Sequence, residues 1–311
     1  MFYPYNRAKF LDYWFEYHIP LVKKHNIKII ISDNHSTDDT KEKVQQYMNI
    51  YPLIEYYCNE ENLGPDRNIE RALKYAKTDY VWLMGDTYVI DEKGIDYVLD
   101  LIIKSNNKYD AIITNSFDRV KGIEERDYLD QNELLSDLGW HVTMLSVNIF
   151  NSKIIFTGNY SRYYETNFLH IGILFEYISN KNFKVHFIKN NLIKYIGEVM
   201  NIKEIKKQSY WARDPFKVWT NDWTNFIFSL PSTYKIETKL KVIMDHGNKS
   251  GLFSFIGLLS LRLNNHLNYK TYKDYSHLFK FTIKYPKFIL LLLSIFPEII
   301  LNVIKKILFK V

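Results

Sequence analysis

Apolar and polar positions alternate in blocks along the first 116 residues of the chain. Four short apolar runs, many of them β-branched, are typical of buried strands: residues 27–32, 54–58, 80–84 and 111–114. The stretches between them repeat apolar residues at helical spacing: residues 9–24, 39–48, 95–103 and a stretch that begins at Gly64. Strands that alternate with helices predict an α/β fold with a mainly parallel sheet covered by helices.

The regular alternation stops after Ser116. Residues 117–200 have a mixed pattern, with possible strands at 142–150 and 184–188, and the pattern from about residue 201 is mostly helical. We therefore predict an α/β domain over residues 1–200 and a helical C-terminal region over residues 201–311.

A very apolar run at residues 288–304 lies between lysines on both sides. Pro297, Glu298 and Asn302 interrupt it, whereas a membrane-spanning helix needs about 20 apolar residues. This pattern favours an anchor at the membrane surface over residues 284–311, with lysines that reach the headgroups. The alternative interpretation is an ordinary helix of the C-terminal core.

The charge of the chain is mildly basic, with 41 Lys and Arg against 35 Asp and Glu. No basic run is dense enough to make nucleic acid the main partner, whereas the lysine- and aromatic-rich C-terminal third favours an anionic surface such as phospholipid. The single cysteine, Cys58, excludes an intrachain disulfide and fits a reducing compartment. The first residues lack a signal-peptide pattern, so we expect a cytoplasmic protein.

The stretch from Ile29 to Thr40 is the most informative part of the sequence. A buried strand ends in acidic and hydroxyl residues, and Ser36, Thr37 or Asp38 can cap the helix that follows. Asp33 therefore lies at the carboxyl end of a buried strand, where α/β sheets bind their ligands. This position predicts a site for a polar ligand.

Two further polar clusters follow strands, at residues 62–68 and 85–87. The ends of neighbouring strands meet at one edge of a doubly wound sheet, so we expect these clusters to lie close to Asp33. A carboxylate can accept from a base or ribose, an arginine can pair with a diphosphate, and a second carboxylate can meet ribose or a metal ion. Together they outline a site for a nucleoside diphosphate.

The ordered set of motifs resembles that of the inverting glycosyltransferases of family two, which have the GT-A fold. The resemblance extends over about residues 3–116 and is strongest to the bacterial branch that builds capsules and O-antigens. The matching motifs are Tyr5-Asn6-Arg7, Asp33-Asn34-His35-Ser36-Thr37-Asp38, Asn62-Leu63-Gly64-Pro65-Asp66-Arg67-Asn68 and Leu83-Met84-Gly85-Asp86.

This resemblance implies transfer of a sugar from a nucleotide-diphosphate sugar, for which we expect a UDP-sugar, to a glycan or lipid-linked glycan. It implies that Asp33 contacts the nucleobase, that Arg67 lies near base and phosphates, and that Asp86 lies near ribose and diphosphate. The full set of implied donor-binding residues is Tyr5, Asn6, Arg7, Asp33, Asn34, Ser36, Asn62, Gly64, Arg67, Asn68 and Asp86. A lipid-linked acceptor would keep the enzyme at the cytoplasmic membrane surface.

The sequence departs from the family pattern in its metal motif. Relatives carry Asp-x-Asp, which ends in a carboxylate that binds Mg²⁺ or Mn²⁺, whereas Gly85-Asp86-Thr87-Tyr88 supplies one aspartate. Neutral oxygens are poor ligands for hard cations, so Asp86 is the candidate metal ligand and we expect weak metal dependence or none.

The second departure concerns the first strand. The family places a buried strand before Tyr-Asn-Arg, and here only residues 1–4 precede that motif. A typical strand has about five to six residues, and an absent central strand leaves backbone groups unpaired. We therefore expect this first strand to be truncated, with the true start upstream.

The catalytic base is expected beyond the donor site, after an acceptor-side segment that residues 139–151 resemble. Glu165 is our choice because it follows at the corresponding place, Asp118 and Asp137 are rivals, and His170 is a candidate base or orienting residue. Two other functions stay open: a non-catalytic nucleotide-sugar-binding paralogue, because Thr87 replaces an acid, and a nucleotidyltransferase, which shares the broad fold.

Overall fold

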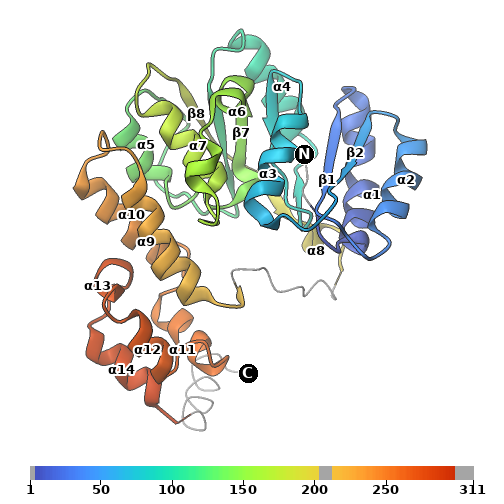
Figure 1. The fold of residues 1–311 in the computed structure, drawn as a ribbon. Coiled ribbons are helices and arrows are strands. Elements are labelled where there is room, and N and C mark those ends of the chain that lie inside the picture. Colours follow the sequence, from blue (N-terminus) through green and yellow to red (C-terminus); the bar gives the residue numbers. More distant parts are fainter. Residues whose placement is uncertain (1–3, 203–211, 298–311) are drawn as a thin grey trace. The chain divides into compact units, whose positions relative to one another are not determined.

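The computed structural model describes residues 4–202 and 212–297 (Figure 1). The chain divides into two compact units. The first contains residues 1–134 and 141–206, and the second contains residues 135–140 and 207–311. The short segment 135–140, which the sequence pattern assigned to the α/β domain, therefore belongs to the helical unit.

The first unit begins with strands and helices in strict alternation. The elements are α1 (Ala8–Lys24), β1 (Ile29–Asp33), α2 (Thr40–Ile50), β2 (Ile54–Cys58) and α3 (Gly64–Tyr75). β1 and β2 pair in parallel, with Ile29 opposite Ile54 and Asp33 opposite Cys58. All five residues of β1 are buried, as its isoleucine-rich sequence predicts. Figure 1 shows α1 and α2 beside this strand pair.

A six-stranded sheet forms the rest of the α/β core. Its strands are β3 (Tyr80–Trp82), β4 (Tyr88–Ile90), β5 (Ala111–Ser116), β6 (Arg126–Tyr128), β7 (Asn148–Asn151) and β8 (Val185–Tyr195). The order is β3-β7-β5-β8-β4, with β6 beside β8. The α/β class is confirmed, and β5 and β8 pair in parallel. The other pairings in this sheet are antiparallel, because β4, β6 and β7 return against their neighbours.

Two details of this sheet differ from the sequence pattern. The predicted strand at 142–150 forms only from Asn148, because the Asn148 side chain donates to the carbonyls of Val142, Met144 and Leu145 and folds that stretch into a turn. β4 was not predicted. The truncated first strand that the sequence predicts falls on residues 1–3, outside the described residues. Within the described ranges, β1 has β2 as its one ladder partner.

Helices cover this sheet. Those of the first unit are α4 (Gly94–Lys104), α6 (Ser152–Thr157), α7 (Leu169–Ile178) and the short α8 (Ile196–Val199), whereas α5 (Gln131–Leu138) begins in the first unit and continues into the second. Val98 of α4 packs on Ile112, Ile149 and Ile188 of the sheet in one buried cluster. α7 is buried over most of its length, which fits its nearly unbroken apolar sequence.

The second unit is helical, as its sequence pattern predicts. Its elements are a π-helical turn (Lys217–Asp222), α9 (Trp223–Ser229), α10 (Ile236–Lys249), α11 (Phe255–Leu263), α12 (Tyr269–Tyr275), α13 (Phe279–Thr282) and α14 (Lys287–Ile295). Aromatic rings dominate its core, where Trp219 stacks on His246 with ring centroids 3.9 Å apart. Among the described residues, no helix is both long enough and apolar enough to cross a membrane.

Candidate active site

The first two motifs lie against each other at the end of β1. The Asn34 N–H donates to the Pro4 carbonyl at 2.8 Å. Asn6 has a left-handed backbone (φ 54°), which asparagine tolerates better than most residues. In this conformation its N–H donates to the Ser36 hydroxyl at 2.8 Å, and its side chain accepts from the Thr37 N–H at 2.8 Å. The structure thus brings together Tyr5-Asn6-Arg7 and the Asp33 loop.

Asp33 is the buried organiser of this loop, with 1% of its surface exposed. Its Oδ1 accepts from the Ser36 N–H at 3.0 Å and from the Ser36 hydroxyl at 2.5 Å. Its Oδ2 accepts from the Tyr56 hydroxyl at 2.6 Å, and burial together with this bond raises the pKa of Tyr56. Asp33 therefore has a structural role in addition to any contact with a ligand.

Asp38 connects the starts of two helices. Its carboxylate accepts from the Ala8 N–H, at the start of α1, and from the Thr40 N–H, at the start of α2, each at 3.2 Å. Carboxylates stabilise helix N-termini because they satisfy unpaired N–H groups and complement the helix dipole. Of the three capping residues that the sequence offered, the structure uses Asp38 in this way.

A network of side-chain amides holds the third motif on β1. Asn34 donates to the Asn62 side chain at 2.8 Å and accepts from the Leu63 N–H at 2.9 Å. Asn68 is fully buried, accepts from the Ser32 hydroxyl at 2.7 Å and donates to the Ser32 carbonyl at 2.9 Å.

Asn59 completes this network by donating to both Asn34 (3.1 Å) and Asn68 (2.9 Å). It lies outside every motif, so the sequence gave no signal for it. Because these amide groups bind one another, they form the framework of the site and leave few free atoms for a ligand.

Asp86 forms a two-point ion pair with Arg7, and both side chains are about 15% exposed. The Arg7 guanidinium also lies 3.8 Å from the centre of the Phe10 ring. A paired arginine neutralises the carboxylate and occupies both of its oxygens. Residues 4–202 and 212–297 contain no group of three or more His, Cys, Asp and Glu side chains that could hold a metal ion.

Tyr88 and Arg119 extend this side of the site beyond the residues that the sequence indicated. Tyr88 pairs with Tyr195 across β4 and β8, and its ring centroid lies 6.1 Å from that of Phe117. Burial raises the pKa of Tyr88, and the nearby charge of Arg119 partly offsets this effect. An aromatic surface with a cation therefore follows Asp86 where relatives carry a second acid.

The loop that carries Glu165 lies on the first turns of α3. Arg67 is exposed, and its guanidinium lies 4.2 Å from the centre of the Tyr164 ring. The Tyr164 hydroxyl donates to Glu70 on the same helix. Glu165 itself is exposed and has a left-handed backbone (φ 65°). Helix α3 thus holds the segment that carries the predicted base.

The rival bases lie in different surroundings. Asp118 is exposed after β5 and exchanges two hydrogen bonds with Asn191, of 2.5 Å and 2.9 Å. His170 is buried on α7, and burial lowers its pKa to about 4. Burial keeps this imidazole from an acceptor hydroxyl, whereas the carboxylates of Glu165 and Asp118 are exposed. We therefore carry Glu165 and Asp118 forward.

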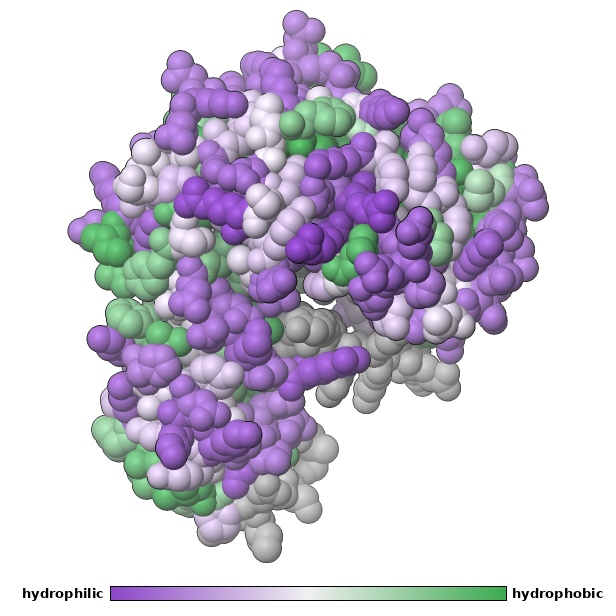
Figure 2. Space-filling model, viewed as in Figure 1, coloured by the Kyte–Doolittle hydropathy of each residue, from purple (hydrophilic) through white to green (hydrophobic). Residues whose placement is uncertain are grey.

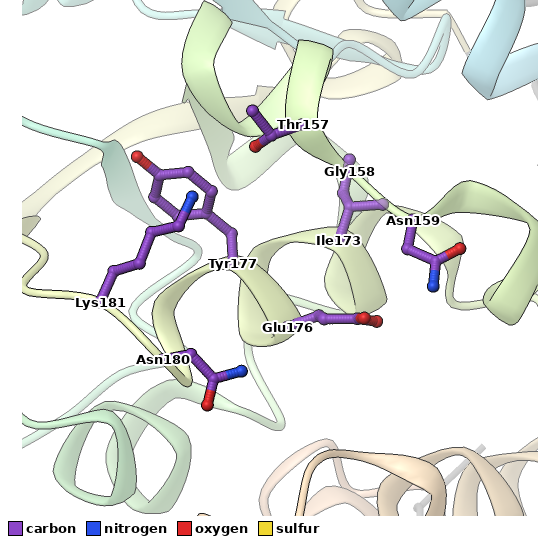
Figure 3. A pocket seen from close by; sticks show the side chains of 8 residues that line it. All are labelled: Thr157, Gly158, Asn159, Ile173, Glu176, Tyr177, Asn180 and Lys181. Carbon is purple, nitrogen blue, oxygen red and sulfur yellow. The ribbon is translucent and has the colours of Figure 1, made fainter.

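A separate cavity of about 140 Å³ lies between α6 and α7 (Figure 3). Its lining residues are Thr157, Gly158, Asn159, Ile173, Glu176, Tyr177, Asn180 and Lys181. Lys181 lies over the Tyr177 ring, and Figure 3 shows Glu176 pointing away from both. None of the sequence-predicted site residues lines this cavity.

The end of β1 thus gathers three polar motifs of the sequence, with the Arg7–Asp86 ion pair next to them. The chain belongs to glycosyltransferase family 2, because the model of the family described as "Glycosyl transferase family 2" matches residues 5–172. It is therefore a glycosyltransferase, and its fold is GT-A.

Two of the curated proteins that match the sequence are named as sugar transferases. The abequosyltransferase RfbV of Salmonella typhimurium is 47% identical over 62 residues, which are 19% of this chain and 18% of that protein. The Campylobacter jejuni GalNAc(5)-diNAcBac-PP-undecaprenol beta-1,3-glucosyltransferase is 25% identical over 294 residues, which are 91% of this chain and 88% of that protein.

Solved structures share the fold. TarS of S. aureus in complex with UDP gives a TM-score of 0.56 at 14% identity, over 94% of this chain and 85% of that one. The mannosyltransferase PcManGT of Pyrobaculum calidifontis, in complex with GDP-Man and Mn²⁺, gives 0.50 at 12% identity, over 90% and 83%.

Proposed function

We propose that the protein is an inverting glycosyltransferase that moves a sugar from a UDP-sugar to a lipid-linked glycan in bacterial surface polysaccharide synthesis. The observation that carries this proposal is the position of the Glu165 loop on α3, the helix that also carries Arg67. The same helix thereby carries a cation for the leaving diphosphate and holds the segment that bears a carboxylate for the acceptor. The UDP bound to TarS and the undecaprenol-linked substrate named for the Campylobacter relative support the donor and acceptor classes.

In this proposal one in-line attack inverts the sugar carbon. Glu165 accepts the proton of the acceptor hydroxyl as the diphosphate leaves from the opposite face. Arg67 makes no ion pair in the described ranges and is exposed, so its charge is available to the diphosphate. Asp33 and the amide network shape the base-binding end of the crevice.

A divalent cation, if bound, would neutralise the diphosphate, and Asp86 would hold it. The donor set fits such an ion poorly, because both Asp86 oxygens are paired with Arg7 and Thr87 and Tyr88 supply neutral oxygens. We therefore propose that arginine side chains provide most of the positive charge.

A donor panel tests the function and the metal requirement together. The full chain is incubated with UDP-, GDP-, CDP- and dTDP-sugars, in Mn²⁺ or in EDTA, and release of the nucleoside diphosphate is measured. We expect release from a UDP-sugar, with less than about threefold loss in EDTA. Release from none of the donors contradicts the function, and abolition by EDTA with rescue by Mn²⁺ contradicts the proposed role of the arginines.

We also propose that the second unit binds an anionic membrane surface through α14. Phe288, Leu292 and Ile295 are exposed on one stripe of this helix, at spacings of four and three residues, whereas Leu290 and Leu293 face the core. Figure 2 shows apolar surface on the part of this unit that contains α12–α14.

The charge beside the stripe supports this partner. Lys280, Lys284 and Lys287 are exposed, and residues 276–297 contain no acid. Each lysine near anionic lipid contributes about 1 kcal/mol, and each buried apolar side chain about 1.5–3 kcal/mol. Residues 298–311 of the predicted anchor lie outside the described residues.

Vesicle binding tests the membrane surface. Changing Phe288, Leu292 and Ile295 together to glutamine should weaken binding to phosphatidylglycerol vesicles at least tenfold, because it removes the exposed apolar stripe. The core side of α14 is unchanged, so the helix should stay folded. Ile236→Gln, on an exposed position of α10, is the matched control and should leave binding unchanged. Sedimentation with vesicles measures the affinity. Equal binding by the triple variant, or none by the unchanged protein, contradicts the proposal.

A further inference from the structure

Three residues at the start of α3 hold the loop that carries Glu165. Asp66 accepts from the Asn167 N–H at 3.2 Å, Arg67 stacks on Tyr164, and Glu70 accepts from the Tyr164 hydroxyl. α3 and α7 pack side by side, so this loop spans from the donor-side helix to the start of α7 (Figure 1).

The backbone of this loop has an unusual shape. Glu165 and Asn167 are both left-handed, with φ of 65° and 69°. Non-glycine residues adopt this region at a cost of roughly 1–2 kcal/mol each. The turn directs the N–H groups of residues 165–167 and 169 toward Asp66, which makes a concave arrangement of donors. An acceptor within such a turn stabilises it, because it satisfies the inward-facing N–H groups.

Asp66 is that acceptor, and it is 5% exposed. Burial raises the pKa of Asp66 to about 6, and the facing N–H groups partly oppose this shift. Of these groups, Asn167 meets hydrogen-bond geometry, whereas Asp66 Oδ1 has no hydrogen-bond partner among the described residues. One oxygen of the buried Asp66 carboxyl therefore accepts a hydrogen bond from the loop, whereas the other lies in a buried position without a donor.

Burial and the facing backbone N–H groups are the largest influences on the pKa of Asp66. The titratable side chains on the elements packed around it are Arg67, Glu70, Arg71, Lys74 and Tyr75 on α3, Asp33 on β1, Lys153 on α6, Tyr164 and Glu165 in the loop, and His170, Glu176 and Tyr177 on α7.

We infer that Asp66 is a positioning residue: from the donor-binding helix it fixes the strained loop that presents Glu165 to the acceptor. The role given to Glu165 rests on the proposed function, whereas the holding of the loop does not. Asp66 is too buried to touch substrate, so it acts through the backbone of residues 165–169.

The direction of the pH effect follows from linkage. When the loop opens, Asp66 becomes solvated and its pKa falls toward the ordinary value of about 3.8, so the closed loop binds protons more tightly than the open loop. Acid therefore favours the closed loop. For a closed-state pKa of about 6, protection of the loop should rise about tenfold between pH 7 and pH 5.

Hydrogen exchange of the loop amides tests this inference without any substrate. The full chain is compared with Asp66→Asn and Asp66→Ala by mass spectrometry of peptides that span residues 160–172, at pH 5–7.5 and corrected for intrinsic exchange. Asparagine keeps an uncharged acceptor, so Asp66→Asn should protect the loop at every pH. Alanine removes the acceptor and should lower protection at least tenfold. Asp100→Ala, an exposed change on α4, is the matched control and should behave like the unchanged protein.

Loop protection that is independent of pH in the unchanged protein overturns the inference, and so does protection that is equal in the alanine variant. If Asp66→Ala does not fold, the inference is tested by two other results: loop protection should depend on pH in the unchanged protein, and this pH dependence should be lost in Asp66→Asn. Activity adds a second readout, in which Asp66→Ala should lower kcat at least tenfold with little change in the donor KM, and Asp66→Asn should restore it. A failed donor panel with a pH-dependent loop would contradict the proposed function alone.

Discussion

Replacing Glu165 by glutamine is expected to lower the rate of sugar transfer by about 10²- to 10⁴-fold, the usual contribution of a general base. The amide keeps the size of the side chain but accepts no proton at neutral pH. Because the left-handed backbone at residue 165 is unaffected by this change, the loop should stay in place. The rate is measured as UDP release from the donor identified in the panel.

Donor binding provides the control for this prediction. The affinity for UDP should change less than about threefold in Glu165→Gln, since the base contacts the acceptor. Asp118→Asn is the matched variant. We expect it to keep most of the activity because Asp118 is hydrogen-bonded to Asn191. A large loss in Asp118→Asn with little effect in Glu165→Gln would transfer the role of the base to Asp118.

Replacing Asp33 by alanine is expected to destabilise the protein by about 3 kcal/mol, in addition to weakening nucleotide binding. The change removes the acceptor of three hydrogen bonds from Ser36 and Tyr56, and each of these partly buried donors left unpaired costs about 1 kcal/mol. The sequence alone predicts a loss of binding without unfolding, and the burial of Asp33 adds the cost in stability.

Urea unfolding measures this cost. Tyr56→Phe removes one of the three donors and keeps the carboxylate, so it should cost about 1 kcal/mol and retain nucleotide binding. Calorimetry with UDP on the folded variants reports binding separately. A stability of Asp33→Ala equal to that of the unchanged protein would contradict the organising role of Asp33.

The sequence predicts the fold well where hydrophobic periodicity is regular. The strands at residues 29–33, 54–58 and 111–116 follow from apolar β-branched runs. β4 was not predicted because a strand of three residues, shortly after the polar Gly85-Asp86 turn, is too short to show a hydrophobic repeat. The stretch before Asn148 was predicted wrongly as strand, because one buried amide binds three carbonyls and no local pattern signals such a contact.

The site shows a different limit of sequence analysis. Motifs locate Asn34, Asn62 and Asn68, but their hydrogen bonds to one another depend on packing that a motif does not encode. Asp66 gave no signal, because an acid in the first turn of a helix is ordinarily explained by the helix dipole. Its burial against residues 165–169 joins segments about 100 positions apart, which spacing along the chain does not reveal.

The amide network also has a consequence for the chemical durability of the protein. Asn34 and Asn68 each donate through nitrogen and accept through oxygen at the same time. Spontaneous deamidation would change the nitrogen into an oxygen and add a charge, with almost no change in shape. At Asn68, for example, a carboxylate oxygen would then face the Ser32 carbonyl, 2.9 Å away in a fully buried position. Slow ageing at these asparagines would therefore disrupt the polar framework at the end of β1 without any cut in the chain.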